Sequence, residues 1–285
     1  MTARRSALLL LLPAGLLVAA LLAAPLLYLL SFSLYQSVPG RMALEPGLTL
    51  ANYVRILTDV YYLGVTARTL ALSLGATAIC LLLGFPLAYF LWRASARWKG
   101  VLTLLVVAPL LISIVVRSYG WMVILGDSGL LNDALRTLGL IDTPLEIMFT
   151  STAVLIGLVH VQFPFMVLSI LAGLEQVDAD LVDAAATLGA PRGRAILEIV
   201  LPLAVPGIVA GVTLVLSLCM TAFVTPTLMG GSGSRVLTTL IYNQFVTVFD
   251  WPLGAALAAL LLVLCLAVTF AIVRVAAGAV RRAGA

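Results

Sequence analysis

The chain has 285 residues, of which 63% are hydrophobic and only 10% are charged. A soluble domain of this length cannot sustain such a balance, because its surface needs charge to stay in solution. Soluble enzymes, nucleic-acid-binding modules and disordered chains are therefore excluded. The formal net charge of +4 bears on membrane topology, since Lys and Arg collect on the cytoplasmic side. The composition predicts a protein that crosses a membrane several times.

Apolar runs of about 20 residues without charges predict six transmembrane helices. In chain order they lie near Ala7–Leu30, Thr69–Trp92, Gly100–Val116 (or as far as Leu125), Phe149–Gly173, Val205–Thr225 and Trp251–Val273. The first run is longer than the apolar region of a signal peptide, so we expect a retained helix. Pro109 and Pro164 fall inside spans three and four and are expected to kink them.

The basic residues predict that both termini lie in the cytoplasm. With that orientation the cytoplasmic segments hold ten of the sixteen basic residues: Arg4, Arg5, Arg93, Arg97, Lys99, Arg192, Arg194, Arg274, Arg281 and Arg282. The opposite side holds the other six, Arg41, Arg55, Arg68, Arg117, Arg136 and Arg235, together with seven of the twelve acidic residues. This asymmetry follows the positive-inside rule.

The sequence offers little chemistry of its own. Lys99 is the only lysine and lies in no phosphate-binding Walker A loop, so the chain is not expected to hydrolyse ATP. No acidic residue lies inside a predicted span, which argues against a stand-alone carrier driven by protons or sodium. A membrane enzyme is disfavoured too, because His160 is the only histidine and no metal-ligand cluster is present.

The segment between spans four and five has the pattern of a helix, a turn and a second helix. Apolar residues recur at spacings of three and four, which predicts one apolar helix face; they are Leu174, Val177, Leu181, Ala184 and Leu188. Asp178, Asp180 and Asp183 lie off this face. Gly189 is expected to end the helix and Pro191 to begin the next. Pro202 and Pro206 are expected to break the path before span five. Because an acidic face is unfavourable beside anionic lipid, we expect this segment to meet a protein partner.

The same segment resembles the EAA loop of ABC-importer permeases. Asp183-Ala184-Ala185, three residues, Gly189, nine residues and then Ile199-Val200-Leu201-Pro202 reproduce the spacing of that motif, with Asp183 in place of its Glu. The resemblance implies a cytoplasmic coupling helix that docks on an ATPase subunit, with this role for Asp183, Ala184, Ala185, Gly189, Ile199, Leu201 and Pro202. Residues 117–126, 163–168, 223–231 and 243–252 further resemble the spermidine/putrescine branch of these permeases.

Several polar and aromatic residues are candidates for the translocation path, each with a simpler alternative. His160 and Gln162 could line a pore or form a hydrogen bond between helices. Arg117 could contact a binding protein or a gate, or extend to the membrane interface. Thr221, Phe223 and Thr225 could line a cavity or pack. Tyr119 and Trp121 could contact a cation, or belong to an aromatic belt at the interface.

These observations predict an all-α membrane protein of six transmembrane helices with a cytoplasmic helix-turn-helix coupling loop. We expect a first helix and outer loop over 1–65, a five-helix core over 66–275 with the loop at 174–203, and a basic tail over 276–285. The resemblance implies an importer permease of the bacterial inner membrane, with no cofactor of its own. Its implied partners are an ATPase dimer carrying ATP and Mg, a second permease (expected to be a paralogue), an external binding protein and membrane lipid. Polyamines are the expected cargo; iron, a sulfate-like anion or a phosphonate is the alternative.

Overall fold

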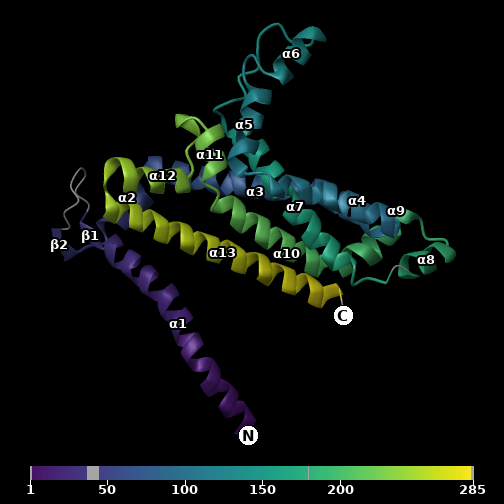
Figure 1. The fold of residues 1–285 in the computed structure, drawn as a ribbon, viewed down its shortest axis with the longest axis horizontal. Helices are drawn as coiled ribbons and strands as arrows, with labels where there is room; N and C mark the ends of the chain where they lie inside the picture. Colours follow the sequence, from purple (N-terminus) through teal and green to yellow (C-terminus); the bar gives the residue numbers. More distant parts are fainter. Residues whose placement is uncertain (1, 37–44, 179, 284–285) are drawn as a thin grey trace. The chain divides into compact units, whose positions relative to one another are not determined.

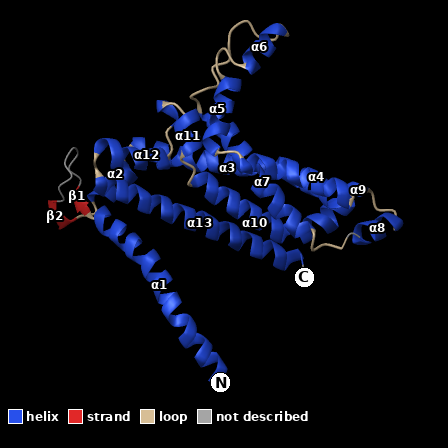
Figure 2. Ribbon diagram, viewed as in Figure 1, coloured by secondary structure: helices blue, strands red, loops and turns tan. Residues whose placement is uncertain are grey.

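The computed structural model describes residues 2–36, 45–178 and 180–283, and these are mostly helical (Figures 1 and 2). Among the described residues, six helical segments are long and apolar enough to cross a membrane: Gly15–Ser33, Val60–Arg93, Ile114–Thr137 (two successive helices), Ser151–Leu174, Gly193–Met220 and Trp251–Val275. The predicted six-span, all-α class is therefore confirmed. Of the residues used to predict topology, Arg41 lies outside the described residues, as do the side chains of Arg4, Arg5, Arg192, Arg281 and Arg282.

The chain divides into two compact units, and the first comprises Met1–Leu63 and Leu240–Val263. It contains α1 (Thr2–Ser33), the antiparallel pair β1 (Tyr35–Gln36) and β2 (Glu45–Leu48), α2 (Ala51–Thr58) and the start of α3 (Val60–Arg93). The end of α12 (Leu237–Asn243), a π turn at Gln244–Val248 and the first part of α13 (Trp251–Ala283) complete it. Asn52 is buried and donates to the carbonyl oxygens of Ser33 (3.0 Å) and Tyr35 (2.8 Å). This amide therefore fixes the end of α1 against α2.

The second unit comprises Gly64–Thr239 and Leu264–Ala285. After α3 come α4 (Ala96–Val107), a 3-10 turn (Ala108–Leu111), α5 (Ile114–Leu125), α6 (Leu130–Thr137) and α7 (Ser151–Leu174). Next are α8 (Asp180–Thr187), α9 (Arg192–Ala195), a π turn (Ile196–Val200), α10 (Leu201–Met220), α11 (Val224–Met229) and a 3-10 turn (Ser232–Ser234). Pro164 lies inside an uninterrupted α7.

The core of the second unit forms where α7 packs against α10 (Figure 1). Gly173 and Gly207 face each other there: a Cβ on Gly207 would lie 2.8 Å from the Cα of Gly173 and 2.9 Å from the carbonyl oxygen of Ser169. Such short distances exclude any side chain and allow the two backbones to touch. Gly207 and Gly211, a GxxxG pair in the sequence, therefore pack within the chain, with Gly211 against Met166 and Ser169 of α7.

Span three differs from the single kinked helix that the sequence predicts. The helix that includes Gly100 ends at Val107, and Pro109 lies in the following 3-10 turn. Ile112 and Ser113 are extended, and α5 begins at Ile114. The physical reason is that Pro109 lacks an N–H and its ring clashes with the preceding turn, which here interrupts the α-helix completely. The predicted start at Gly100 lies inside the helix Ala96–Val107, so what the structure corrects is the expected continuity across Pro109.

Span five also begins earlier than the sequence predicts. The chain from Arg192 to Met220 is helical throughout, as α9, the π turn and α10 in succession. Pro202 stands in the first turn of α10, and Pro206 lies inside the helix. A wider π turn just before Pro202 accommodates a residue that cannot donate a backbone hydrogen bond. The expected break at Pro202 and Pro206 is therefore wrong, and the second limb of the loop is continuous with a membrane span.

Candidate functional site

The helix-turn-helix predicted between spans four and five is present, and its turn depends on one glycine. The carboxylate of Asp178 accepts the backbone N–H of Asp180 (3.0 Å) and caps the start of α8. At the other end Gly189 has φ of +82°, and the N–H of Ala190 bonds the carbonyl oxygen of Ala185 (3.0 Å). This is the left-handed helix end that glycine favours. Gly189 therefore ends the helix as predicted, and Pro191 stands immediately before α9.

The apolar face of this helix is not the one that the spacing predicts. Val182 and Ala185 are buried, whereas Leu181 is 45% and Leu188 is 89% exposed. The predicted stripe holds for Leu174 and Val177, which are buried, and is wrong beyond them. α7 ends at Leu174 and α8 begins at Asp180, so the two segments do not share one helical phase. The consequence is an exposed face formed by Leu181, Ala184 and Leu188.

Two acidic residues of the loop form ion pairs with cations from other elements of the chain. Asp183 accepts a hydrogen bond from Nη2 of Arg93, at the end of α3, over 3.0 Å. Glu175, which follows α7, pairs with Nζ of Lys99 in the first turn of α4 (2.5 Å). A cavity of about 380 Å³ lies beside the first pair, lined by Tyr89, Arg93, Val182, Asp183, Ala190, Ala195 and Ile196.

The remaining motif residues lie on the second limb. Ile199 is half-buried in the π turn, and Leu201 and Pro202 open α10. Ile199 packs at the edge of the same apolar core that contains Val182, Ala185 and Val200. Along the chain the motif therefore comprises the partly exposed helix α8, the turn at Gly189 and the half-buried Ile199 at the edge of the core.

Three of the candidate path residues meet between α5 and α7. Nε1 of Trp121 donates to Nδ1 of His160 over 3.1 Å, with the two rings edge to face at 5.6 Å. Arg117 lies one helical turn before Trp121 on the same side of α5. Its Nε and Nη1 atoms are buried and have no hydrogen-bond partner among the described residues.

The other candidates lie in varied surroundings. Tyr119 is 54% exposed, and Thr221 donates to the carbonyl oxygen of Ser217 (2.8 Å) in its own helix. Phe223 is half-buried before α11. Gln162 and Thr225 are buried, and Oε1 of the first and Oγ1 of the second lack partners in the described part of the chain. Polar atoms of this kind inside a span are expected to face protein or water.

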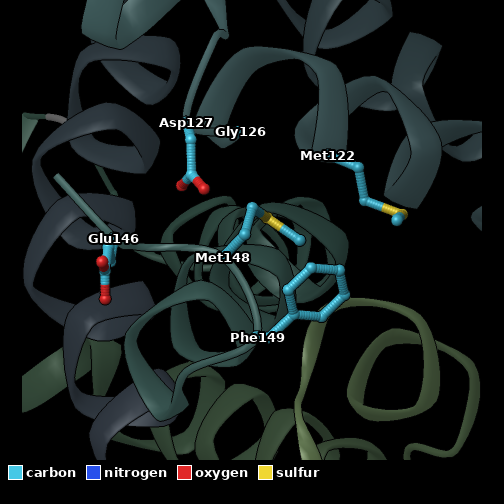
Figure 3. Close-up of a pocket in the computed structure, with 6 residues that line it drawn as sticks. All are labelled: Met122, Gly126, Asp127, Glu146, Met148 and Phe149. Atoms are coloured by element: carbon cyan, nitrogen blue, oxygen red, sulfur yellow. The ribbon is translucent and has the colours of Figure 1, made fainter. Parts of the chain in front are cut away.

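The structure also forms a pocket that sequence reasoning missed (Figure 3). It has a volume of about 290 Å³ at the N-terminal end of α7 and is lined by Met122, Gly126, Asp127, Glu146, Met148 and Phe149. Asn132 shapes it: its amide donates to the carbonyl oxygens of Gly126 (2.9 Å) and Leu145 (3.2 Å) and accepts the N–H of Leu145 (2.8 Å). No spacing in the sequence signals that Asp127 and Glu146 line one pocket, because an irregular segment joins them.

Comparison with known proteins identifies the family. The sequence pattern of the family described as "Binding-protein-dependent transport system inner membrane component" matches residues 47–282. The Spermidine/putrescine transport system permease protein PotB of Salmonella typhimurium (strain SL1344) is 41% identical over 208 residues, 73% of this chain and 72% of that protein. PotB of Escherichia coli (strain K12) is 40% identical over 208 residues, 73% and 75% of the two chains.

A solved structure shows the same fold. A chain of a bacterial ABC transporter "involved in the import of the acidic polysaccharide alginate" superposes with a TM-score of 0.79 at 20% identity, covering 96% of each chain. Proteins of this family span the inner membrane several times and work with a binding protein and with ATPase subunits that carry the ATP chemistry. The resemblance seen in residues 183–202 is thus confirmed at the level of the family. This chain belongs to the inner-membrane permease components of binding-protein-dependent ABC importers.

Proposed function

We propose that the chain is a permease subunit of an ATP-driven importer of the polyamines putrescine and spermidine. The observation that carries this proposal is its 41% identity, over 208 residues, to a permease named for spermidine and putrescine. The partners would be a second, paralogous permease, a dimer of ATPase subunits and an external binding protein. Both termini and α8 would lie on the cytoplasmic side.

The pocket at the N-terminal end of α7 supports a cationic cargo. α7 has 24 residues, so it extends about 36 Å and crosses a bilayer core, which separates this pocket from α8 at its other end. The pocket combines the carboxylates of Asp127 and Glu146 with the ring of Phe149 (Figure 3). Carboxylates attract ammonium groups, and an aromatic face adds cation–π attraction. The pocket is therefore suited to receive a polyamine from the external side.

The coupling role is proposed for the face formed by Leu181, Ala184 and Leu188 together with the turn at Gly189. These leucines are exposed although they are apolar, which is typical of a surface that another protein covers. Closure of the ATPase dimer would displace α8, and the spans would change from inward- to outward-facing.

The test is uptake of labelled putrescine and spermidine in a strain without this chain, with the chain restored, and with Gly189→Arg. We expect uptake only with the intact chain, and normal membrane abundance of the variant. Uptake that never depends on the chain, in a strain without other polyamine importers, would refute the polyamine assignment; uptake of a phosphonate, sulfate or iron instead would establish the alternative. Uptake that survives Gly189→Arg would refute the coupling role.

A second arm tests the pocket. Asp127→Asn is expected to raise the KM for spermidine by up to about fivefold, the range of one exposed charge interaction. Asp142→Asn is the matched control, because Asp142 is an exposed acid in the same segment that does not line the pocket. An equal effect of the two variants would show that only general surface charge matters.

A further inference from the structure

The corner between α3 and α4 carries two cations that reach the coupling loop from outside its motif. Arg93 is the last residue of α3, Ser95 precedes α4, and Lys99 lies in the first turn of α4. Arg93 pairs with Asp183 inside α8, and Lys99 pairs with Glu175 at the start of the loop. This one corner therefore contacts the loop at two points, one before and one after the start of α8.

These two pairs differ from the third ion pair of the region. Arg194 and Glu198 also pair (2.9 Å), but they lie four residues apart on one helical segment and join no two elements. Arg93 and Asp183 are 90 positions apart in the chain, so their bond ties α8 to a membrane span that is remote in sequence. Among these three pairs, the two at the corner can pass a displacement of the loop to another span.

The packing beneath α8 explains why charge is needed there. The cavity of about 380 Å³ is lined by Tyr89 and Arg93 of α3 and by residues of α8 and α9. Apolar side chains that do not fill their interface hold neighbouring elements less firmly, because dispersion attraction weakens over a small gap. The ion pair at this cavity supplies a directional contact that side-chain packing does not.

We infer that Arg93 and Lys99 are positioning residues for energy coupling. Their ion pairs tie the loop to the α3–α4 corner, so that a displacement of α8 also moves this corner. Through α4 the corner leads into the interrupted span and α5, which carries Arg117 and Trp121. A movement started at α8 would thus reach the polar cluster through α3 and α4 as well as through α10. The inference rests on the proposed contact of α8 with an ATPase subunit.

The pair of Lys99 and Glu175 allows a test by charge exchange. A glutamate at 99 stands in the first turn of α4, and a lysine at 175 stands at the end of α7. Each exchanged charge thus suits the dipole of its helix, so the double variant can keep both helices intact. Neither residue belongs to the motif that would contact the ATPase.

The experiment uses the assembled importer with its binding protein in proteoliposomes and measures spermidine imported per ATP hydrolysed. We expect Lys99→Glu to lower this ratio at least about fivefold, the lower range of coupling between sites, while the complex assembles and hydrolyses ATP. Lys99→Glu with Glu175→Lys should restore it, and Arg93→Lys should retain more of it than Arg93→Gln. Arg97→Glu is the matched control, because Arg97 is an exposed cation of the same corner without either pair.

The inference is overturned if the exchanged pair is no better than Lys99→Glu alone, if Arg97→Glu lowers the ratio equally, or if Arg93→Gln leaves it unchanged. Failure of the underlying function is distinguishable. If the Gly189→Arg complex still imports spermidine, the loop itself has no coupling role. If the Gly189→Arg complex is inactive but the Lys99→Glu complex imports a normal amount of spermidine per ATP, the loop keeps its coupling role and only the positioning role of Arg93 and Lys99 is refuted.

Discussion

The contact between Gly173 and Gly207 allows a quantitative prediction for Gly207→Ala. The added Cβ would lie 2.8 Å from the Cα of Gly173 and 2.9 Å from the oxygen of Ser169, whereas carbon atoms rest at about 3.5–4.0 Å. Because both obstacles are backbone atoms, α7 and α10 must separate by about 1 Å. Overpacking of this kind costs about 1–3 kcal/mol, which corresponds to a fall in Tm of roughly 2–10 °C.

Thermal unfolding of the purified protein in detergent measures this loss. Gly75→Ala is the matched control, because its Cβ would meet only the Cδ1 atom of Leu155 at 3.6 Å, an ordinary contact. Gly211→Ala should fall between them, since its Cβ meets the sulfur of Met166, a flexible side chain, at 2.9 Å. If the Tm of Gly207→Ala equals or exceeds that of Gly75→Ala, the backbones of α7 and α10 do not touch at this point and the reasoning is refuted.

Two further substitutions test local structure. Gly189→Ala should destabilise the loop by about 1–2 kcal/mol, because the φ of Gly189 is +82°. Its control is Gly193→Ala, which should be neutral or stabilising because Gly193 lies in α9 with open space at its Cβ. Hydrogen exchange in α8 should be faster in the Gly189→Ala variant only, and equal exchange in the two variants would contradict the prediction. Asn132→Ala removes three hydrogen bonds that fix the segment between Gly126 and Leu145. Because these bonds together contribute about 1 kcal/mol or more, proteolysis of this segment should accelerate by at least about fivefold. An unchanged cleavage rate would contradict the role assigned to Asn132.

The elements that the sequence predicts well are those set by local chemistry. Long apolar runs define the spans, and Gly189 ends a helix for reasons contained in its own backbone. The spacing from Asp183 to Pro202 identifies the family because each motif residue has a fixed offset from the others. Of the path candidates, Trp121 and His160 do meet, although their role in transport stays a prediction.

The features that the sequence does not reveal arise from packing between distant segments. The periodicity of Leu181 and Leu188 suggests burial, but a break after α7 and the position of α3 decide which face is covered. The partner of Asp183 is 90 positions away, and no local pattern encodes that pairing. Propensity favours a break at Pro202, whereas a π turn accommodates this residue within a continuous helix.

That continuous helix has a geometric consequence for the span. From Gly193 to Met220 it is a rod of 28 residues, and its tightest contact with α7 is at Gly207. About 21 Å of helix lie on the loop side of that contact and about 20 Å lie beyond it. If this helix tilts about that point without bending at the π turn or at Pro206, its two ends move through nearly equal distances in opposite directions. On the proposed coupling role, the residues near Met220 would then move about as far as the loop does, in the opposite direction.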